Sequence, residues 1–194
     1  MNDDPWLDRW LPLLAQRAGD LPVLELGCGA GLDTAVLCEA GHRVIALDLS
    51  QVSIAKAKAH APAAQFHCQD VRAPFPVGPE SVNVVVASLS LHYFPWDETR
   101  ALVGRIRRVL GQAGVLLCRL NSTNDRHYGA VGHTALERNY YLVDGAPKRF
   151  FSQPEVQALF AHGWRWLCQE ENLIHRYVYP KAAWEVVVER TEAA

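Results

Sequence analysis

Apolar and polar residues follow one another along the chain in blocks that predict strands and helices in turn. Runs at 23–26, 43–48, 82–87 and 115–120 are mostly apolar without alternation, which is typical of strands covered on both faces, and 64–68 predicts a further short strand. Between them, 32–39, 51–59 and 97–110 have helical spacing. This order predicts an α/β fold with a doubly wound, mostly parallel sheet and helices on both faces.

Punctuating residues mark several of these boundaries. Ser50 is a candidate N-cap, Gly41 a candidate C-cap, and the segment from Gly111 to Gly114 predicts a turn before the strand at 115–120. At the beginning, apolar residues within 6–14 predict an amphipathic helix that is interrupted or restarted at Pro12. Towards the end, we predict a helix at 153–160 and strands at 164–170 and 183–189.

The segment 121–149 differs from the rest because it is polar and aromatic and lacks a clear period. Loops of this length in a compact domain are usually functional elements such as lids. We therefore expect a single domain over 1–194, with an N-terminal helical cap at 1–20 and a substrate-side insert at 121–149.

Composition narrows the class of partner. The chain has 194 residues, 49% of them hydrophobic, and a net charge of −2, which excludes a disordered chain and disfavours binding to nucleic acid. The acidic N-terminus and the absence of a long apolar stretch predict a cytoplasmic protein without a membrane partner. None of the five cysteines forms a pattern typical of metal ligands, so we expect no metal.

The most informative motif is the loop from Gly27 to Gly31, with the sequence Gly-Cys-Gly-Ala-Gly, between a predicted strand and a predicted helix. Such a loop lets the backbone approach a nucleotide-like ligand at the carboxyl edge of a parallel sheet. Asp48 ends the next strand, where a carboxylate can accept from both ribose hydroxyls, and Asp70 follows the third strand, where it can accept from an adenine amino group.

Four segments together carry a family resemblance. VLELGCGAG, ALDLS, CQDV and VVVASLSLHYF resemble, in the same order, the motifs of class I S-adenosylmethionine-dependent methyltransferases. The chain looks closest to the small-molecule group that includes tellurite-resistance-type enzymes. The resemblance implies a Rossmann-like, seven-stranded sheet with an antiparallel last strand, S-adenosylmethionine as cofactor, and a small-molecule methyl acceptor.

The resemblance also implies which residues bind the cofactor. Glu25 and the loop residues Gly27, Cys28, Gly29 and Gly31 would hold its methionine part, and Ser88 and Leu89 would line the same side. Asp48 would bind the ribose, Leu49 would lie on the adenine, and Asp70 and Val71 would face the adenine edge. An unpaired carboxylate within an apolar strand is costly, which favours a functional role for Glu25.

Two alternatives remain at this point. Asp48 lies 21 residues after Gly27, a spacing that also suits a nicotinamide dinucleotide site of an oxidoreductase, although that fingerprint requires a glycine where this chain has Leu32. The second alternative is a protein that binds S-adenosylmethionine without turnover, as a sensor or interaction module. Binding residues alone do not separate this second alternative from an enzyme.

The chemistry of the acceptor side is less marked in the sequence. His92 is a candidate general base, substrate hydrogen-bonding group or loop cap. The surrounding segment lacks the Asn/Asp-Pro-Pro-Tyr/Phe motif that is associated with methylation of amino groups on nucleic acid bases and on glutamine. Candidate substrate contacts, with packing or solvated surface as the alternative, are Tyr93, Arg119, Asn121, Asn124, Tyr128, Tyr140 and Arg149, with Tyr141 and Arg176 able to close over the site.

Overall fold

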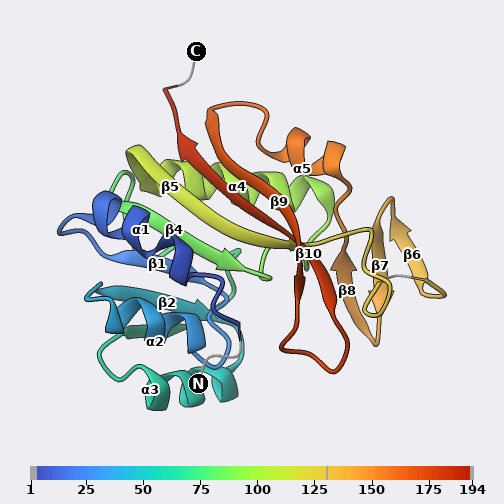
Figure 1. Ribbon diagram of the computed structural model, residues 1–194, viewed down its shortest axis with the longest axis horizontal. Helices are drawn as coiled ribbons and strands as arrows, with labels where there is room; N and C mark the ends of the chain where they lie inside the picture. Colours follow the sequence, from blue (N-terminus) through green and yellow to red (C-terminus); the bar gives the residue numbers. More distant parts are fainter. Residues whose placement is uncertain (1–3, 130, 193–194) are drawn as a thin grey trace.

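The central feature of the computed structural model, which describes residues 4–129 and 131–192, is a seven-stranded sheet (Figure 1). Its strand order is β3-β2-β1-β4-β5-β10-β9. Neighbours from β3 to β5 are parallel, and β10 is inserted antiparallel between β5 and β9. The strands are β1 (Val23–Leu26), β2 (Val44–Asp48), β3 (Gln65–Cys68), β4 (Val82–Ser88), β5 (Leu110–Asn121), β9 (Trp164–Ile174) and β10 (Lys181–Arg190). This confirms the predicted fold class.

Helices cover both faces of the sheet, as the lack of alternation in its strands predicts. The short helix η1 (Asp8–Trp10), α1 (Leu11–Ala18), α2 (Leu32–Glu39) and α3 (Gln51–His60) lie on one face, where Leu14, Leu37 and Ile54 are buried. The other face is covered by α4 (Trp96–Val109) and α5 (Gln153–Leu159), through Ile106 and Val156. Because the strands from β3 to β5 in the sheet order are parallel, their carboxyl ends lie at one edge of the sheet.

Local capping explains two of the helix starts. The Ser50 hydroxyl accepts from the Ser53 amide at 3.2 Å and begins α3, as predicted. Ser152 begins α5 with a capping box, in which its own backbone amide donates to the Glu155 carboxylate at 2.9 Å. Ser50 and Ser152 each end the loop before the helix, so these caps fix where α3 and α5 begin.

Two predictions for this part of the chain are wrong. The expected turn from Gly111 to Gly114 is part of β5, which continues through it with an irregularity in its pairing to β4. The insert is not an aperiodic loop, because it contains a second, antiparallel sheet of β6 (Thr134–Glu137), β7 (Tyr140–Val143) and β8 (Ala146–Arg149) (Figure 1). These strands have four residues each and β6 is exposed along its length, so no period of two emerges in the sequence.

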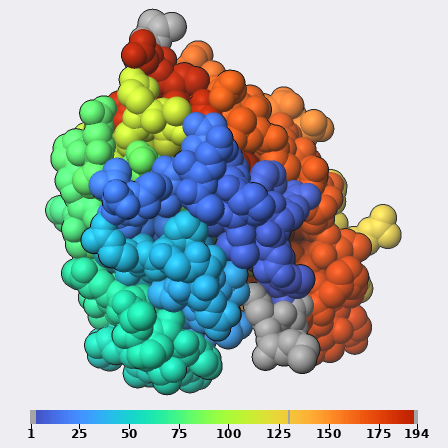
Figure 2. Space-filling view, turned by 60° about the vertical axis from the view of Figure 1, so that its left-hand side comes forward, coloured from blue at the N-terminus to red at the C-terminus, as the bar shows by residue number. Residues whose placement is uncertain are grey.

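The N-terminal segment contacts α2 on one side and the β9–β10 pair on the other. Figure 2 shows it on the surface between α2–α3 and the β9–β10 pair. Trp6 Nε1 donates to Asp33 at 3.0 Å, and Arg9 forms salt bridges with Glu170 and Glu185. Among the described residues, no helix combines the length and the hydrophobicity needed to span a bilayer.

Candidate functional site

A cavity of about 1190 Å³ lies at the carboxyl ends of the parallel strands. One wall comes from the ends of β1, β2, β3 and β4, and the opposite wall from the insert and the β9–β10 loop. The volume exceeds the roughly 300–1,000 Å³ typical of a pocket for one drug-sized ligand. There is therefore room for a nucleoside-sized group together with a small second molecule.

The glycine loop forms the floor of this cavity through two positions with different constraints. Gly27 has a φ of 73°, and a Cβ there would lie 2.4 Å from the Ser90 Cβ, so only glycine fits. Gly29 has a φ of 54°, but the space beside it is open. Its backbone amide donates to Asp48 Oδ2 at 2.8 Å. The loop thus leaves bare backbone facing the cavity.

Asp48, at the end of β2, is held by two backbone amides. Oδ2 accepts from Gly29, and Oδ1 accepts from Ser50 at 2.8 Å. Each oxygen of a carboxylate has more than one acceptor position, so each retains capacity for another donor. Leu49 borders the same cavity with 70% of its surface exposed. Asp48 can accept hydrogen bonds from ribose hydroxyls, and Leu49 offers an apolar surface to a flat ring.

Asp70, after β3, forms an ion pair that the sequence did not indicate. Arg72 donates to both of its carboxylate oxygens, with Nη2 at 2.6 Å from Oδ2. These hydrogen bonds hold the pKa of Asp70 below its usual value. Asp70, Val71 and Arg72 all line the cavity. The carboxylate therefore meets a ligand as part of a neutral pair.

Glu25 lies behind the glycine loop and is 3% exposed, so it does not line the cavity itself. The Thr34 hydroxyl donates to its Oε2 at 2.5 Å. Burial, followed by the charge of Asp33, raises the pKa of Glu25 to about 8. A buried carboxyl that retains its proton at pH 7 is one that a nearby cation would ionise.

The segment after β4 forms the central wall of the cavity. Leu89 has a φ of 53°, an uncommon conformation for a non-glycine residue and one that is concentrated at functional sites. Ser90 Oγ and His92 Nδ1 are buried polar atoms without a hydrogen-bond partner among the described residues. Burial, followed by the charges of Lys181 and Lys148, lowers the pKa of His92 to about 3. The imidazole is therefore neutral at pH 7.

The cavity brings together many of the residues predicted from sequence. Those that line it are Gly27, Gly29, Asp48, Leu49, Asp70, Val71, Ser88, Leu89, His92, Tyr93, Tyr128 and Tyr140, together with Arg176. Cys28 and Gly31 lie outside the lining: the Cys28 side chain packs into the core, and a Cβ at Gly31 would lie 2.8 Å from Ala57. These two loop positions thus serve packing in this structure.

The structure corrects the placement of Arg149 and Asn121. Arg149 is 2% exposed, and its guanidinium donates to the backbone oxygens of Phe94 and Arg138 at 3.1 Å and pairs with Glu137. Asn121 is fully buried and donates to the Arg149 carbonyl oxygen at 3.3 Å. Both side chains instead make contacts that hold the insert against the main sheet.

Arg119 is corrected in the same way. It is 2% exposed, forms a salt bridge with Asp4 at 2.5 Å, and donates from Nε to Ser88 Oγ at 2.9 Å. It does not line the cavity, but it holds Ser88, which does.

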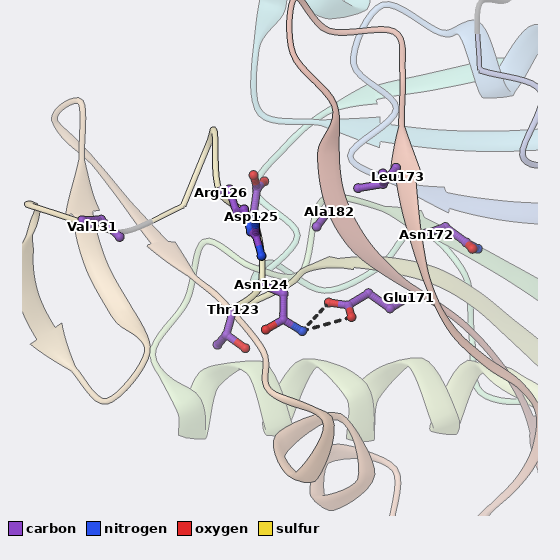
Figure 3. Close-up of a pocket in the computed structure, with 9 residues that line it drawn as sticks. All are labelled: Thr123, Asn124, Asp125, Arg126, Val131, Glu171, Asn172, Leu173 and Ala182. Atoms are coloured by element: carbon purple, nitrogen blue, oxygen red, sulfur yellow. Dashed lines mark hydrogen bonds between the residues drawn. The ribbon is translucent and has the colours of Figure 1, made fainter.

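Asn124 belongs to a second cavity of about 660 Å³, between the start of the insert and the β9–β10 pair. Figure 3 shows its side chain directed at Glu171, where Nδ2 donates to both carboxylate oxygens at 3.0 Å. Asn124 therefore lies outside the cavity at the sheet edge, and its prediction as a substrate contact there is wrong, because the chain turns away from that edge after β5.

Several lining residues escaped sequence reasoning. They include Arg72, Ser90, Phe94, Lys148, Tyr177 and Lys181. Arg72 was detectable, since it is next but one to Asp70. Lys148, Tyr177 and Lys181 come from β8 and the β9–β10 segment, whose return to the sheet edge has no local signal in the sequence.

Residues 23–114 match a family model described as a methyltransferase domain. A trans-aconitate 2-methyltransferase of Delftia acidovorans is 35% identical over 97 residues, 48% of this chain and 35% of that protein. A malonyl-[acyl-carrier protein] O-methyltransferase of Hamiltonella defensa is 27% identical over 151 residues, 75% of this chain and 55% of that protein. The chain spans between about a third and just over half of the length of the curated relatives it matches.

Solved structures share the fold. A structure of a SAM-dependent methyltransferase from Methanosarcina mazei superposes with a TM-score of 0.75 at 15% identity, covering 92% of this chain and 97% of that chain. A Burkholderia thailandensis 1,6-didemethyltoxoflavin-N1-methyltransferase, solved with 1,6-didemethyltoxoflavin and S-adenosylhomocysteine bound, superposes with a TM-score of 0.72 at 21% identity, covering 95% of this chain and 76% of that chain.

Proposed function

We propose that this chain, whose residues 23–114 match a methyltransferase domain and whose fold is shared with S-adenosylmethionine-dependent methyltransferases, transfers a methyl group from S-adenosylmethionine to a small-molecule acceptor. The observation that carries the proposal is the cavity at the sheet edge, where Asp48 faces a bare glycine-loop backbone with acceptor capacity to spare. A loop of this kind lets the backbone approach a nucleotide-like ligand.

Different residues around the cavity would bind different parts of the cofactor. Asp48 would accept from the ribose hydroxyls, Leu49 would lie against the adenine, and Asp70 and Val71 would border the adenine edge. The glycine loop, Ser88 and Leu89 would line the methionine part, with Glu25 behind the loop as the counter-charge of the ammonium group. Each of these assignments uses a residue type suited to its ligand atom.

The cofactor supplies a methyl group that its sulfonium already activates. The chain then has to align the acceptor in line with the breaking carbon–sulfur bond and to exclude water. His92 and Tyr93 border the space beyond the methionine side. Because His92 is neutral and hard to protonate, we assign it a hydrogen bond to the acceptor through Nδ1 rather than the role of general base.

The size of the acceptor follows from the room that is left. The cavity of about 1190 Å³ has to hold the cofactor as well, which favours a small molecule. One relative is named for trans-aconitate and another for a malonyl group on acyl-carrier protein. These names support a small acceptor group, either as a free molecule or attached to a carrier protein. With a net charge of −2, nucleic acid is not proposed as a partner. We propose that 1–194 acts as one domain, with the insert as a wall of the site.

The alternative of a binding protein without turnover is separated by activity. We expect S-adenosylhomocysteine to bind in a calorimetric titration, and methyl-donor consumption to appear with at least one member of a panel of metabolites. Binding without consumption would favour a sensor. Tight NADH binding together with no binding of S-adenosylhomocysteine would refute the proposed function and favour an oxidoreductase.

A further inference from the structure

Three cationic side chains gather on the wall of the cavity that faces the acceptor. Lys148 comes from β8, Arg176 from the loop between β9 and β10, and Lys181 from the start of β10. Figure 1 shows β8 beside the β9–β10 hairpin, far along the chain from the glycine loop. The acidic lining residues Asp48, Asp70 and Glu98 come from the ends of β2 and β3 and from α4, together with Arg72, which pairs with Asp70 and Glu98.

The protein compensates the charge of Arg176 through Tyr177, Asp4 and Asp33, and that of the two lysines less directly. Among residues 4–129 and 131–192, neither Lys148 nor Lys181 forms a salt bridge. Arg176 lies 3.5 Å from Asp4, but that carboxylate also pairs with Arg119 at 2.5 Å. Like charges gathered in a half-buried place destabilise one another unless an anion joins them.

Lys181 lies among charges of both signs. Burial lowers the pKa of Lys181, and the charges of Lys148 and Arg176 lower it further, while Asp125 acts in the opposite direction. The acids that face the group are Asp125, which acts on Lys181, and Asp4 and Asp33, which act on Arg176. Within the described part of the chain, neither Asp125 nor Asp33 forms a salt bridge with Lys148 or Lys181.

Two aromatic rings and one unpartnered polar atom also belong to this cavity. The Tyr128 and Tyr177 rings lie 5.5 Å apart, and Lys181 Nζ is 5.7 and 5.8 Å from their centres. The buried, unpartnered Nδ1 of His92 belongs to the same cavity. A ligand here meets cations, flat apolar faces and a free hydrogen-bonding atom together.

We propose that the methyl acceptor is a small molecule carrying an oxyanion group, a carboxylate or a phosphate, which is bound between Lys148 and Lys181 with Arg176 at its edge. This inference rests on the proposed function and names the substrate class of the same site. The oxyanion supplies the negative charge that the two lysines lack, and the Tyr128 and Tyr177 rings cover the rest of the molecule.

The first measurement is the binding of probes by calorimetry, with and without S-adenosylhomocysteine. The probes are benzoate, succinate and phenyl phosphate, with benzamide and succinamide as uncharged counterparts. We expect at least one anion to bind ten times more tightly than the uncharged probes. Stronger binding by the carboxylates or by phenyl phosphate identifies the group. If no anion is preferred, the proposal is overturned.

The second measurement uses Lys148→Met and Lys181→Met, which keep an apolar stem, with Lys58→Met on the exposed surface of α3 as the matched control. Charged hydrogen bonds contribute about 1.5–3 kcal/mol, so each pocket substitution should weaken the anion about tenfold or more. Lys181→Arg should restore most of the affinity, and Lys58→Met should leave it unchanged.

S-adenosylhomocysteine separates the two proposals, because it carries a carboxylate of its own. If the lysine variants weaken it as much as the anion, the cations belong to the cofactor and the inference is overturned. If S-adenosylhomocysteine does not bind at all, the proposed function fails, while anion binding by the cofactor-free protein still tests the lysines.

Discussion

Glu25→Gln tests the charge behind the glycine loop in a way that no surface substitution does. Glu25 is buried with a pKa of about 8, against an ordinary value of 4.5, and its side chain accepts a hydrogen bond from the Thr34 hydroxyl. Glutamine keeps the shape and the amide oxygen that accepts this bond, but it carries neither charge nor titratable proton.

The effect on stability follows from linkage. Between pH 4.5 and 8 the unfolded chain has lost the Glu25 proton while the folded chain retains it, so stability falls as pH rises, by up to about 1.4 kcal/mol per pH unit. At pH 7 the loss in the free energy of unfolding, relative to pH 4.5, is about 3 kcal/mol. Glu25→Gln removes this dependence, and we expect it to stabilise the protein by about 1–3 kcal/mol at pH 7 in urea unfolding.

The effect on binding has the opposite sign. A cofactor ammonium beside Glu25 favours the carboxylate, so binding of S-adenosylhomocysteine at pH 7 should release close to one proton, and affinity should rise up to tenfold per unit between pH 6 and 8. Calorimetry in two buffers of different ionisation enthalpy measures the proton. In Glu25→Gln the release should vanish and affinity at pH 8 should fall, while Glu39→Gln, an exposed control, should behave as the parent.

Asp33 is a second buried carboxyl with a raised pKa beside Glu25, which makes the variant essential to the assignment. If Glu25→Gln binds as tightly as the parent with the same proton release, the ammonium is not near Glu25 and the reasoning is refuted. A loss of stability at pH 7 would equally contradict the account of its buried charge.

Three further outcomes are expected. Asp48→Asn should weaken S-adenosylhomocysteine about 30-fold by calorimetry, because an amide oxygen cannot accept from both the Gly29 and Ser50 amides as well as the ribose, whereas the exposed Asp20→Asn should not. Gly27→Ala should cost at least about 2 kcal/mol in urea unfolding, since its Cβ would lie 2.4 Å from Ser90, and Gly29→Ala, in open space, only about 1–2 kcal/mol of strain; equal costs would contradict this. Arg149→Met should cost about 3 kcal/mol of stability by stranding two carbonyl oxygens, with S-adenosylhomocysteine affinity within twofold of the parent; weaker binding in a stable variant would return Arg149 to the site.

The sequence by itself determined the parallel core and the sheet edge at which the cavity lies. The strand at 23–26, the helix at 32–39 and the cap at Ser50 agree with the structure because each depends on local chemistry: an unbroken apolar run, a glycine loop, a hydroxyl beside a free amide. Asp48 was identifiable for the same reason, since the end of a parallel strand faces the edge where the glycine loop lies.

Only the tertiary structure decided which polar residues of the second half reach the cavity. Arg149 and Lys148 are neighbours on β8, yet the arginine is buried against backbone oxygens and the lysine borders the cavity. Successive residues of a strand point to opposite faces, but which face meets the site depends on where the insert docks. That docking is made by contacts far apart in sequence, such as Arg149 with Phe94, which leave no pattern in the chain itself.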